Sequence, residues 1–361
     1  MKTLITALLL TLMFGCKADE DLPKGTLDGN LYFPSETEWE KVDKSLLGIS
    51  DQELEALKAF LEINNTRAFL ILKDGKIVVE EYFGKEILTS NDFSQESLWY
   101  WASAGKTLVS FSVGLAQEQG LLNIEDKTSK YLGEHWTALP LEKENLITVK
   151  NQLNMTSGLD IDVADSHCFE PNCLQYKADA GTRWDYHNGS YTSLHNVVSS
   201  AVGESFDSFY QENLRDKIGM TGFWQFVDND NVYFSDARSF ARFGLLMLNN
   251  GDWDGETIMS DKTYFNEMIN TSQNLNEAYG YLWWLNGKSS GMVPSIQTVF
   301  PTMLSPTAPV DMIAAMGLNG QLLNIIPSEN LVVLRMGDSP SGQIGLNFQN
   351  DLWRELSEML D

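Results

Sequence analysis

Residues 68–83 read AFLILKDGKIVVEEYF, the pattern of two β-strands joined by a tight turn. Two runs rich in apolar and β-branched residues flank Asp74 and Gly75, a dipeptide that favours the tight turn of a β-hairpin. Upstream, Ser50 and Glu53 have the spacing of a capping box, which predicts a helix ending near Asn64. The sequence therefore predicts a helix followed by an antiparallel hairpin.

Strand-like segments return near the C-terminus. Three apolar runs, VDMIAAM, QLLNIIP and NLVVLRM, follow one another within residues 310–336, and an amphipathic helix is expected near residues 346–360. Helical and loop segments fill the middle of the chain. We therefore predict an α+β fold, in which one antiparallel sheet is built from N- and C-terminal strands and flanked by helices. A largely helical insert is expected at about residues 110–250.

The first residues are not expected to belong to the fold. Residues 4–15 read LITALLLTLMFG, which is too short to span a bilayer and is typical of a signal peptide. MFGC, ending at Cys16, resembles a bacterial lipobox whose cysteine receives lipid, and the KADED that follows resembles a Bacteroidetes export tag. We predict a signal peptide (1–15), a tether (16–44) and one domain (45–361). The protein would be a lipid-anchored bacterial lipoprotein in the periplasm or on the outer-membrane surface; a plain secretory signal is the alternative.

The other two cysteines agree with export. Cys168 and Cys173 lie in HCFEPNC and can close a small disulfide loop in an oxidising compartment. A metal site is less favoured there, because only His167 is adjacent. The chain has 25 Lys and Arg against 50 Asp and Glu, a net charge of −25. Such a surface repels nucleic acid and anionic headgroups, so membrane attachment would come from the acyl chains.

The chemistry is expected in YWASAGKTLVSF, residues 100–111. On a helix, Ser103 and Lys106 would share one face with Cβ atoms about 5–6 Å apart. A buried lysine can lose its proton at neutral pH and then activate a serine. The alternative is a capping serine with a lysine that extends into solvent. A second serine motif, GKSSG at 287–291, is rejected as a nucleophile elbow because no helix and no later histidine follow it.

Further segments give this pair a family context. In order, SAGK at 103 is followed by LNMTSGL (153–159), AGTRWDYHNGSY (180–191), FARFGLLMLNNGDWDGETIMS (240–260), YGYLWW (279–284) and GLNGQLLNIIP (317–327). Their order and spacing resemble the serine hydrolases of the β-lactamase and penicillin-binding-protein superfamily. The similarity is to the branch of class C β-lactamases, D-amino-acid carboxypeptidases, esterases and nylon-oligomer hydrolases.

The resemblance implies roles for individual residues. Ser103 would be the acyl-forming nucleophile, Lys106 its base and Tyr186 a second proton carrier. Asn188 would hold Lys106 and the substrate by hydrogen bonds. The backbone N–H groups of Ser103 and Gln321 would form the oxyanion hole. The resemblance implies no cofactor and no metal.

After the motifs of Ser103 and Tyr186, the family has a third motif, which falls on residues 318–320 of this chain. This third motif departs from the family pattern. Most relatives carry Lys-Thr-Gly or His-x-Gly where this chain has Leu318, Asn319 and Gly320. Leucine cannot pair with a substrate carboxylate, so the expected substrate is an ester, amide or peptide-like small molecule with an uncharged acyl group. Trp283 is expected to line its site, with one of Trp283 and Trp284 in the core. The alternatives are a penicillin-binding D-amino-acid peptidase or β-lactamase, and a non-catalytic binding lipoprotein.

Overall fold

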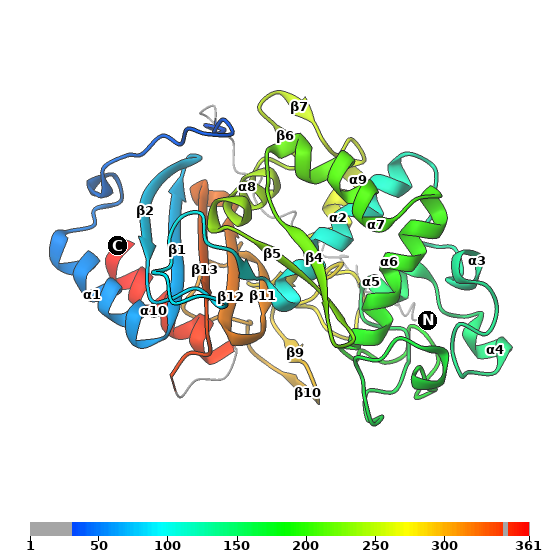
Figure 1. Cartoon of the computed structure of the whole chain (residues 1–361). Coiled ribbons are helices and arrows are strands. Elements are labelled where there is room, and N and C mark those ends of the chain that lie inside the picture. Colours follow the sequence, from blue (N-terminus) through cyan, green and yellow to red (C-terminus); the bar gives the residue numbers. More distant parts are fainter. Residues whose placement is uncertain (1–30, 342–345, 361) are drawn as a thin grey trace, which may run out of the picture.

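The computed structural model describes residues 31–341 and 346–360, and a six-stranded antiparallel sheet forms its centre (Figure 1). The strand order is β2-β1-β13-β12-β11-β8. The strands are β1 (Thr66–Lys73), β2 (Lys76–Tyr82), β8 (Trp284–Leu285), β11 (Ile313–Gly317), β12 (Gln321–Ile326) and β13 (Leu331–Gly337). The predicted hairpin at Asp74 and Gly75 joins β1 to β2, and β1 pairs antiparallel with β13. The prediction that strands from both ends of the chain share one sheet is confirmed.

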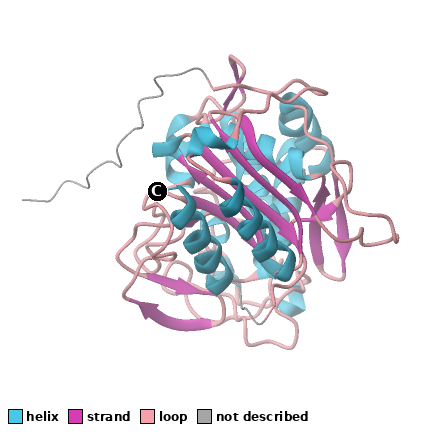
Figure 2. Cartoon of the chain, turned by 90° about the vertical axis from the view of Figure 1, so that its left-hand side faces the viewer, coloured by secondary structure: helices cyan, strands magenta, loops and turns pink. Residues whose placement is uncertain are grey.

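Helices cover both faces of this sheet (Figure 2). On one face lie α1 (Asp51–Ile63) and α10 (Leu346–Leu360), which also contact each other, and on the other face α8 (Ala237–Leu248) packs against β12, β13 and β1. A Cβ atom on Gly244 of α8 would come within 2.7 Å of Val332 in β13, so a glycine is needed for this close approach. The predicted capping box of Ser50 and Glu53 opens α1.

The middle of the chain is largely helical, as predicted, and also carries small sheets. Its helices are α2 (Lys106–Glu118), α3 (Ser129–Leu132), α4 (Leu141–Glu144), α5 (Val149–Leu153), α6 (Asn188–Val202), α7 (Phe206–Tyr210) and α9 (Lys262–Met268). The minor strands are β3 (Trp99–Tyr100), β4 (Phe223–Val227), β5 (Asp230–Ser235), β6 (Asp252–Trp253), β7 (Glu256–Thr257), β9 (Gly291–Val293) and β10 (Ile296–Phe300). None of the helices within the described residues is long and apolar enough to cross a membrane.

The folded domain starts earlier than predicted. Residues 31–44 were expected to belong to a tether, but Leu31 is buried in the core. The N–H of Tyr32 donates to the carbonyl of Asp74, and Lys41 forms a parallel bridge with Ile77 of β2. This segment therefore borders the sheet beside β2, because its backbone and apolar side chains find partners there. The predicted signal peptide, the lipid site at Cys16 and the tether up to residue 30 lie outside the described residues.

A buried carboxylate fixes this N-terminal segment to the domain. The side chain of Glu80 in β2 is 4 % exposed. Its carboxylate forms ion pairs with Nζ of Lys41 at 2.7 Å and with Nε of Arg238 at 2.7 Å. Tyr82 donates its hydroxyl to the same carboxylate at 2.8 Å. Burial alone would raise the pKa of Glu80, but these donors outweigh it and lower the pKa from 4.5 to about 2.

We predict that Glu80→Gln lowers the free energy of unfolding at pH 7 by about 3 kcal/mol, because it leaves two cations without their shared anion. The folded-state pKa lies below the unfolded value, so this contribution is complete above pH 4.5 and is lost toward pH 2. Urea unfolding at several pH values measures both effects. The neighbouring Glu81→Gln is the matched control and should change stability little, because the side chain of Glu81 forms only a weak ion pair, with Lys58 at 3.5 Å, within the described part of the chain. Equal stability of the two variants at pH 7 would contradict the assignment.

Candidate active site

Ser103 and Lys106 meet at the start of α2. Ser103 lies in a 3₁₀ turn, Ala102–Gly105, that runs directly into the helix, and Lys106 is the first residue of α2. Nζ of Lys106 donates to Oγ of Ser103 at 3.0 Å. Ala102 has a φ of 47°, a left-handed conformation that is strained for a residue with a Cβ atom. The turn thus holds a partly exposed serine against a buried amine.

The surroundings of Lys106 favour its neutral form. Only 4 % of the residue is exposed, and this burial lowers the pKa of Lys106 to about 8. The negative charge of Asp230 acts in the opposite direction but is outweighed. Nζ lies over two aromatic rings, 4.3 Å from the centre of Tyr191 and 5.3 Å from that of Tyr186. With this pKa, about a tenth of Lys106 is an unprotonated amine at pH 7, compared with far less for a lysine in water.

Tyr186 has the opposite tendency. Burial raises its pKa, and a hydrogen bond with Ser103 acts in the other direction without cancelling that effect. Its ring stacks on Trp284 at a centroid distance of 6.0 Å. At neutral pH Tyr186 thus keeps its proton and is available as a donor beside Ser103.

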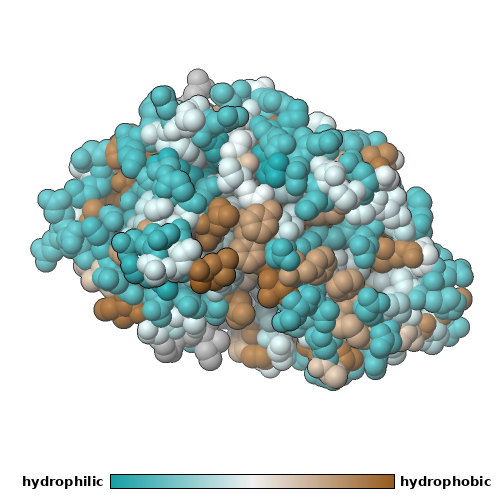
Figure 3. Space-filling view, in the orientation of Figure 1, coloured by the Kyte–Doolittle hydropathy of each residue, from teal (hydrophilic) through white to brown (hydrophobic). Residues whose placement is uncertain are grey.

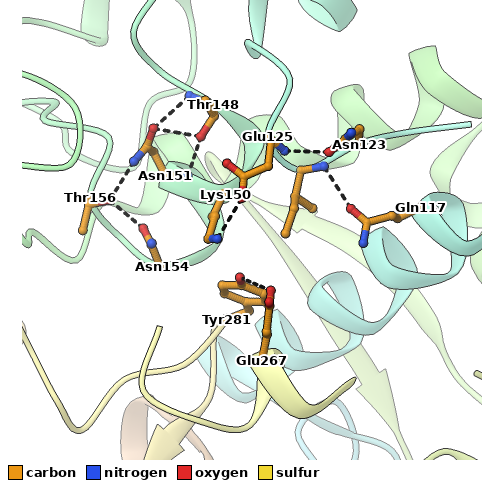
Figure 4. A network of polar contacts seen from close by, with 11 residues as sticks. Gln117, Asn123, Glu125, Thr148, Lys150, Asn151, Asn154, Thr156, Glu267 and Tyr281 are labelled. Atoms are coloured by element: carbon orange, nitrogen blue, oxygen red, sulfur yellow. Dashed lines mark hydrogen bonds and ion pairs between the residues drawn. The ribbon is translucent and has the colours of Figure 1, made fainter. Parts of the chain in front are cut away.

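A turn after α5 braces the segment that carries Tyr186. The carbonyl of Met155 accepts from the N–H of Asp185, and the carbonyl of Leu153 accepts from the N–H of Leu282. The turn is itself fixed by the capping box of Thr148 and Asn151 and by the bonds among Asn151, Asn154 and Thr156 (Figure 4). The stretches LNMTSGL, AGTRWDYHNGSY and YGYLWW therefore meet in space.

Asn188 begins α6, but its contacts differ from the expected one. Its Nδ2 lies 3.1 Å from Nε2 of His167, whereas among the described residues Lys106 has no hydrogen bond to it. Its Oδ1 is buried and has no hydrogen-bond partner within the described part of the chain. The predicted disulfide between Cys168 and Cys173 is present, with Cα atoms 5.8 Å apart, and it follows His167 directly.

The third motif lies against the serine turn. A Cβ atom on Gly317 would come within 2.4 Å of the carbonyl oxygen of Trp101, so only glycine lets the end of β11 approach this turn. Leu318 is 73 % exposed, and Nδ2 of Asn319 donates to the hydroxyl of Tyr100 at 2.8 Å. Gln321 opens β12 directly after Gly320. The structure thus brings the segment of Leu318, Asn319, Gly320 and Gln321 to the segment of Ser103.

Arg335 supports this turn and was missed in the sequence, where it reads as part of an apolar strand. Its guanidinium is fully buried and donates to the carbonyls of Asn319 at 2.5 Å and Gly320 at 3.0 Å. It also donates to the carbonyl of Asn64 at 2.6 Å, to that of Asp338 at 2.9 Å and to the hydroxyl of Thr66 at 3.2 Å. Burial lowers the pKa of Arg335 to about 9, which leaves it charged at neutral pH.

Both tryptophans of YGYLWW are buried, and the prediction that Trp283 contacts substrate is wrong. Trp283 has no exposed surface and its ring stacks on Phe243 of α8 at 5.9 Å. Trp284 lies beside Tyr186 on the opposite side of the chain. Neighbouring residues of an extended segment face opposite ways, and the sequence alone did not show which one faces α8.

The described residues contain no group of three or more His, Cys, Asp or Glu side chains that could hold a metal ion. The groups placed at Ser103 are instead the amine of Lys106 and the phenol of Tyr186. This set suits proton transfer and acyl transfer.

Comparisons with known proteins agree with this geometry. The sequence model of a family described as Beta-lactamase matches residues 65–342. An uncharacterized protein of Alkalihalophilus pseudofirmus is 23 % identical over 313 residues, which cover 78 % of this chain and 86 % of that protein.

Solved structures share the fold. A Bacillus anthracis protein provisionally assigned as a 6-aminohexanoate-dimer hydrolase has a TM-score of 0.67 at 18 % identity, covering 92 % of this chain and 91 % of that one. A penicillin-binding protein homolog from Caulobacter crescentus has a TM-score of 0.67 at 11 % identity, covering 87 % and 99 %. A β-lactamase from Mycobacterium bovis has a TM-score of 0.60 at 16 % identity, covering 86 % and 100 %.

We predict that Arg335→Lys lowers kcat for a simple ester such as p-nitrophenyl acetate by roughly 10- to 100-fold, because one ammonium cannot hold carbonyls on both sides of the guanidinium. The carbonyls released belong to the turn that places Gln321. Arg354→Lys, at an exposed ion pair on α10, is the control and should leave kcat unchanged. A folded Arg335→Lys protein with the kcat of the parent would show that the turn holds its position without Arg335.

Proposed function

This chain belongs to the beta-lactamase family, and from that premise we propose that it is a serine hydrolase that acts through an acyl-enzyme on Ser103. The substrate would be an ester or amide with an uncharged acyl group. The observation that carries the proposal is the hydrogen bond of 3.0 Å between Ser103 Oγ and the buried amine of Lys106.

The opposite pKa shifts of Lys106 and Tyr186 support different roles for the two groups. The neutral amine of Lys106 takes the proton of Ser103 as Oγ attacks the acyl carbon. The backbone N–H groups of Ser103 and Gln321 would stabilise the negative oxygen that forms. Tyr186, which holds its proton at neutral pH, gives it to the leaving alcohol or amine and is reprotonated from Lys106. Water then attacks the acyl-enzyme by the reverse proton path and releases the acid.

The surface around the site favours an uncharged acyl group. Leu318 extends into solvent where most relatives carry a cation, and Asn319 and Gly320 add no charge. The β9–β10 hairpin lies against the Tyr186 segment, since Nε2 of Gln297 in β10 donates to the carbonyl of Trp184 at 3.0 Å. Exposed apolar side chains border this region from β4, β10 and the third-motif turn, namely Phe223, Phe226, Val227, Ile296, Val299, Phe300 and Leu318. Apolar side chains gather over β4, β5, β11 and β12 in Figure 3.

We also propose that the protein is held at a membrane through lipid on Cys16. The support is the lipobox-like sequence at residues 13–16 and a disulfide, which favours an oxidising compartment. Its net charge of −25 makes direct binding to an anionic membrane surface unfavourable.

We predict that a soluble form beginning after Cys16 is labelled by a fluorophosphonate probe at Ser103, because the neutral amine of Lys106 activates that hydroxyl. Ser103→Ala should abolish the labelling, as read by peptide mass mapping. Ser289→Ala is the matched control, because Ser289 is the exposed serine of GKSSG and donates to Glu277 at 2.8 Å. It should be labelled like the parent.

A substrate panel then separates the alternatives. The proposal predicts turnover of simple esters and slow acylation by penicillin. Fast, stable acylation by penicillin would favour a D-amino-acid peptidase, and its rapid turnover a β-lactamase. A folded parent protein that is not labelled would overturn the hydrolase proposal in favour of a binding lipoprotein.

A further inference from the structure

A chain of three polar side chains starts at the surface and ends at Asn188 of α6, the helix whose Tyr191 contacts the catalytic amine. Oδ2 of Asp230, the first residue of β5, lies 2.7 Å from Nδ1 of His167. Nε2 of His167 lies 3.1 Å from Nδ2 of Asn188. Asn188 is in the first turn of α6, and Tyr191, three residues farther on, places its ring 4.3 Å from Nζ of Lys106. Residues three apart share a helix face, so Asn188 lies on the face of α6 that carries Tyr191.

The protonation of Asp230 and His167 determines which atom donates in each of these hydrogen bonds. A carboxylate only accepts, so Nδ1 of a neutral His167 must carry the hydrogen that Asp230 receives. Its Nε2 is then an acceptor and can be satisfied only by the NH₂ group of Asn188. The amide oxygen of Asn188 is consequently turned away from His167, and it is the buried atom without a partner among the described residues. An acceptor in that position can receive a hydrogen from the Lys106 amine.

The loop that carries His167 is anchored on two sides. The N–H of Gly189 in α6 donates to the carbonyl of Ser166 at 3.0 Å, and a Cβ atom at position 189 would come within 2.1 Å of the carbonyl oxygen of Cys168. Asp165 accepts from Nδ2 of Asn229 at 2.7 Å, which ties the loop to the turn before β5. The disulfide closes the loop directly after His167.

We propose that His167 and Asp230 are positioning residues that hold the amide of Asn188 with its oxygen toward Lys106. The inference rests on the proposed function, because it concerns the orientation of the base during acyl transfer. A protonated His167 would present an N–H at Nε2 to the NH₂ group of Asn188. The amide would then have to rotate, and its NH₂ group would face the amine.

Several charged groups act on His167. Its hydrogen bond with Asp230 raises the pKa of His167 above the usual value of 6.5, and burial lowers it less strongly. Asp165 in the same loop adds to the rise, and Lys106 on α2 opposes it. His187, which caps α6, also interacts electrostatically with His167, and burial lowers the pKa of His187 to about 4. His167 should therefore be protonated at a higher pH than an ordinary histidine, and at a higher pH than His187.

The test is the pH dependence of Ser103 acylation by a fluorophosphonate in His167→Ala. We expect its rate to be about tenfold below that of the parent at pH 9, where His167 of the parent is neutral. At pH 5.5 the two rates should become nearly equal, because protonation of His167 in the parent has the same effect as its removal. Asn229→Ala removes the contact with Asp165 but leaves the chain of three side chains, so it should follow the parent at both pH values.

A second variant covers a failure of His167→Ala to fold. Asp230→Asn keeps the ring of His167 but removes the charge that fixes the ring proton on Nδ1. It should reduce the acylation rate about two- to fivefold at pH 9. It should also lower the pH at which protonation of His167 reduces the rate. A loss in His167→Ala that is the same at both pH values, or an equal loss in Asn229→Ala, would show that His167 only docks the loop. Labelling of the parent at Ser103 together with such a result overturns this proposal alone. No labelling of the parent overturns both proposals.

Discussion

The site depends on keeping the ammonium side chain of Lys106 out of water beside a serine. Moving a lysine pKa from 10.5 to about 8 corresponds to a destabilisation of the ammonium form by about 3 kcal/mol relative to water. The rings of Tyr186 and Tyr191, together with the start of α2, create this environment. The same burial raises the pKa of Tyr186. Burial disfavours the charged form of either group, so it promotes loss of a proton from the Lys106 ammonium and hinders loss of a proton from the Tyr186 phenol.

The sheet positions the other half of the site. Pairing of β1 with β13 brings the two ends of the domain together, and β11 and β12 continue the sheet to the serine turn. Gly317 permits the close approach, and the buried charge of Arg335 joins the third-motif turn to the start of β1 and the end of β13. A buried cation without a carboxylate is costly, but a guanidinium whose donors meet backbone carbonyls is partly compensated. The geometry of the oxyanion site is thereby coupled to the stability of the sheet.

Much of the fold could be predicted because several of its elements are each specified by a short stretch of sequence. The turn at Asp74 and Gly75, the capping box at Ser50 and the apolar runs within residues 310–336 each specify their own element. Three features that depend on contacts distant in sequence had no such signal. The docking of residues 31–44, the contact of Asn188 with His167 and the turn-holding role of Arg335 arise only when the chain is folded. Asn188 was predicted as a site residue from the motif around Tyr186, but nothing in that motif indicates a partner 21 residues upstream.

The central claim concerns the protonation of Lys106, and an NMR titration of the protein with isotope-labelled lysine measures it directly. The signal of Lys106 would be assigned as the one missing from Lys106→Arg. The account predicts a midpoint near pH 8, well below the value of a lysine in water. A midpoint above about pH 10, as for a lysine in water, would contradict it, because the amine could not then serve as the base at neutral pH.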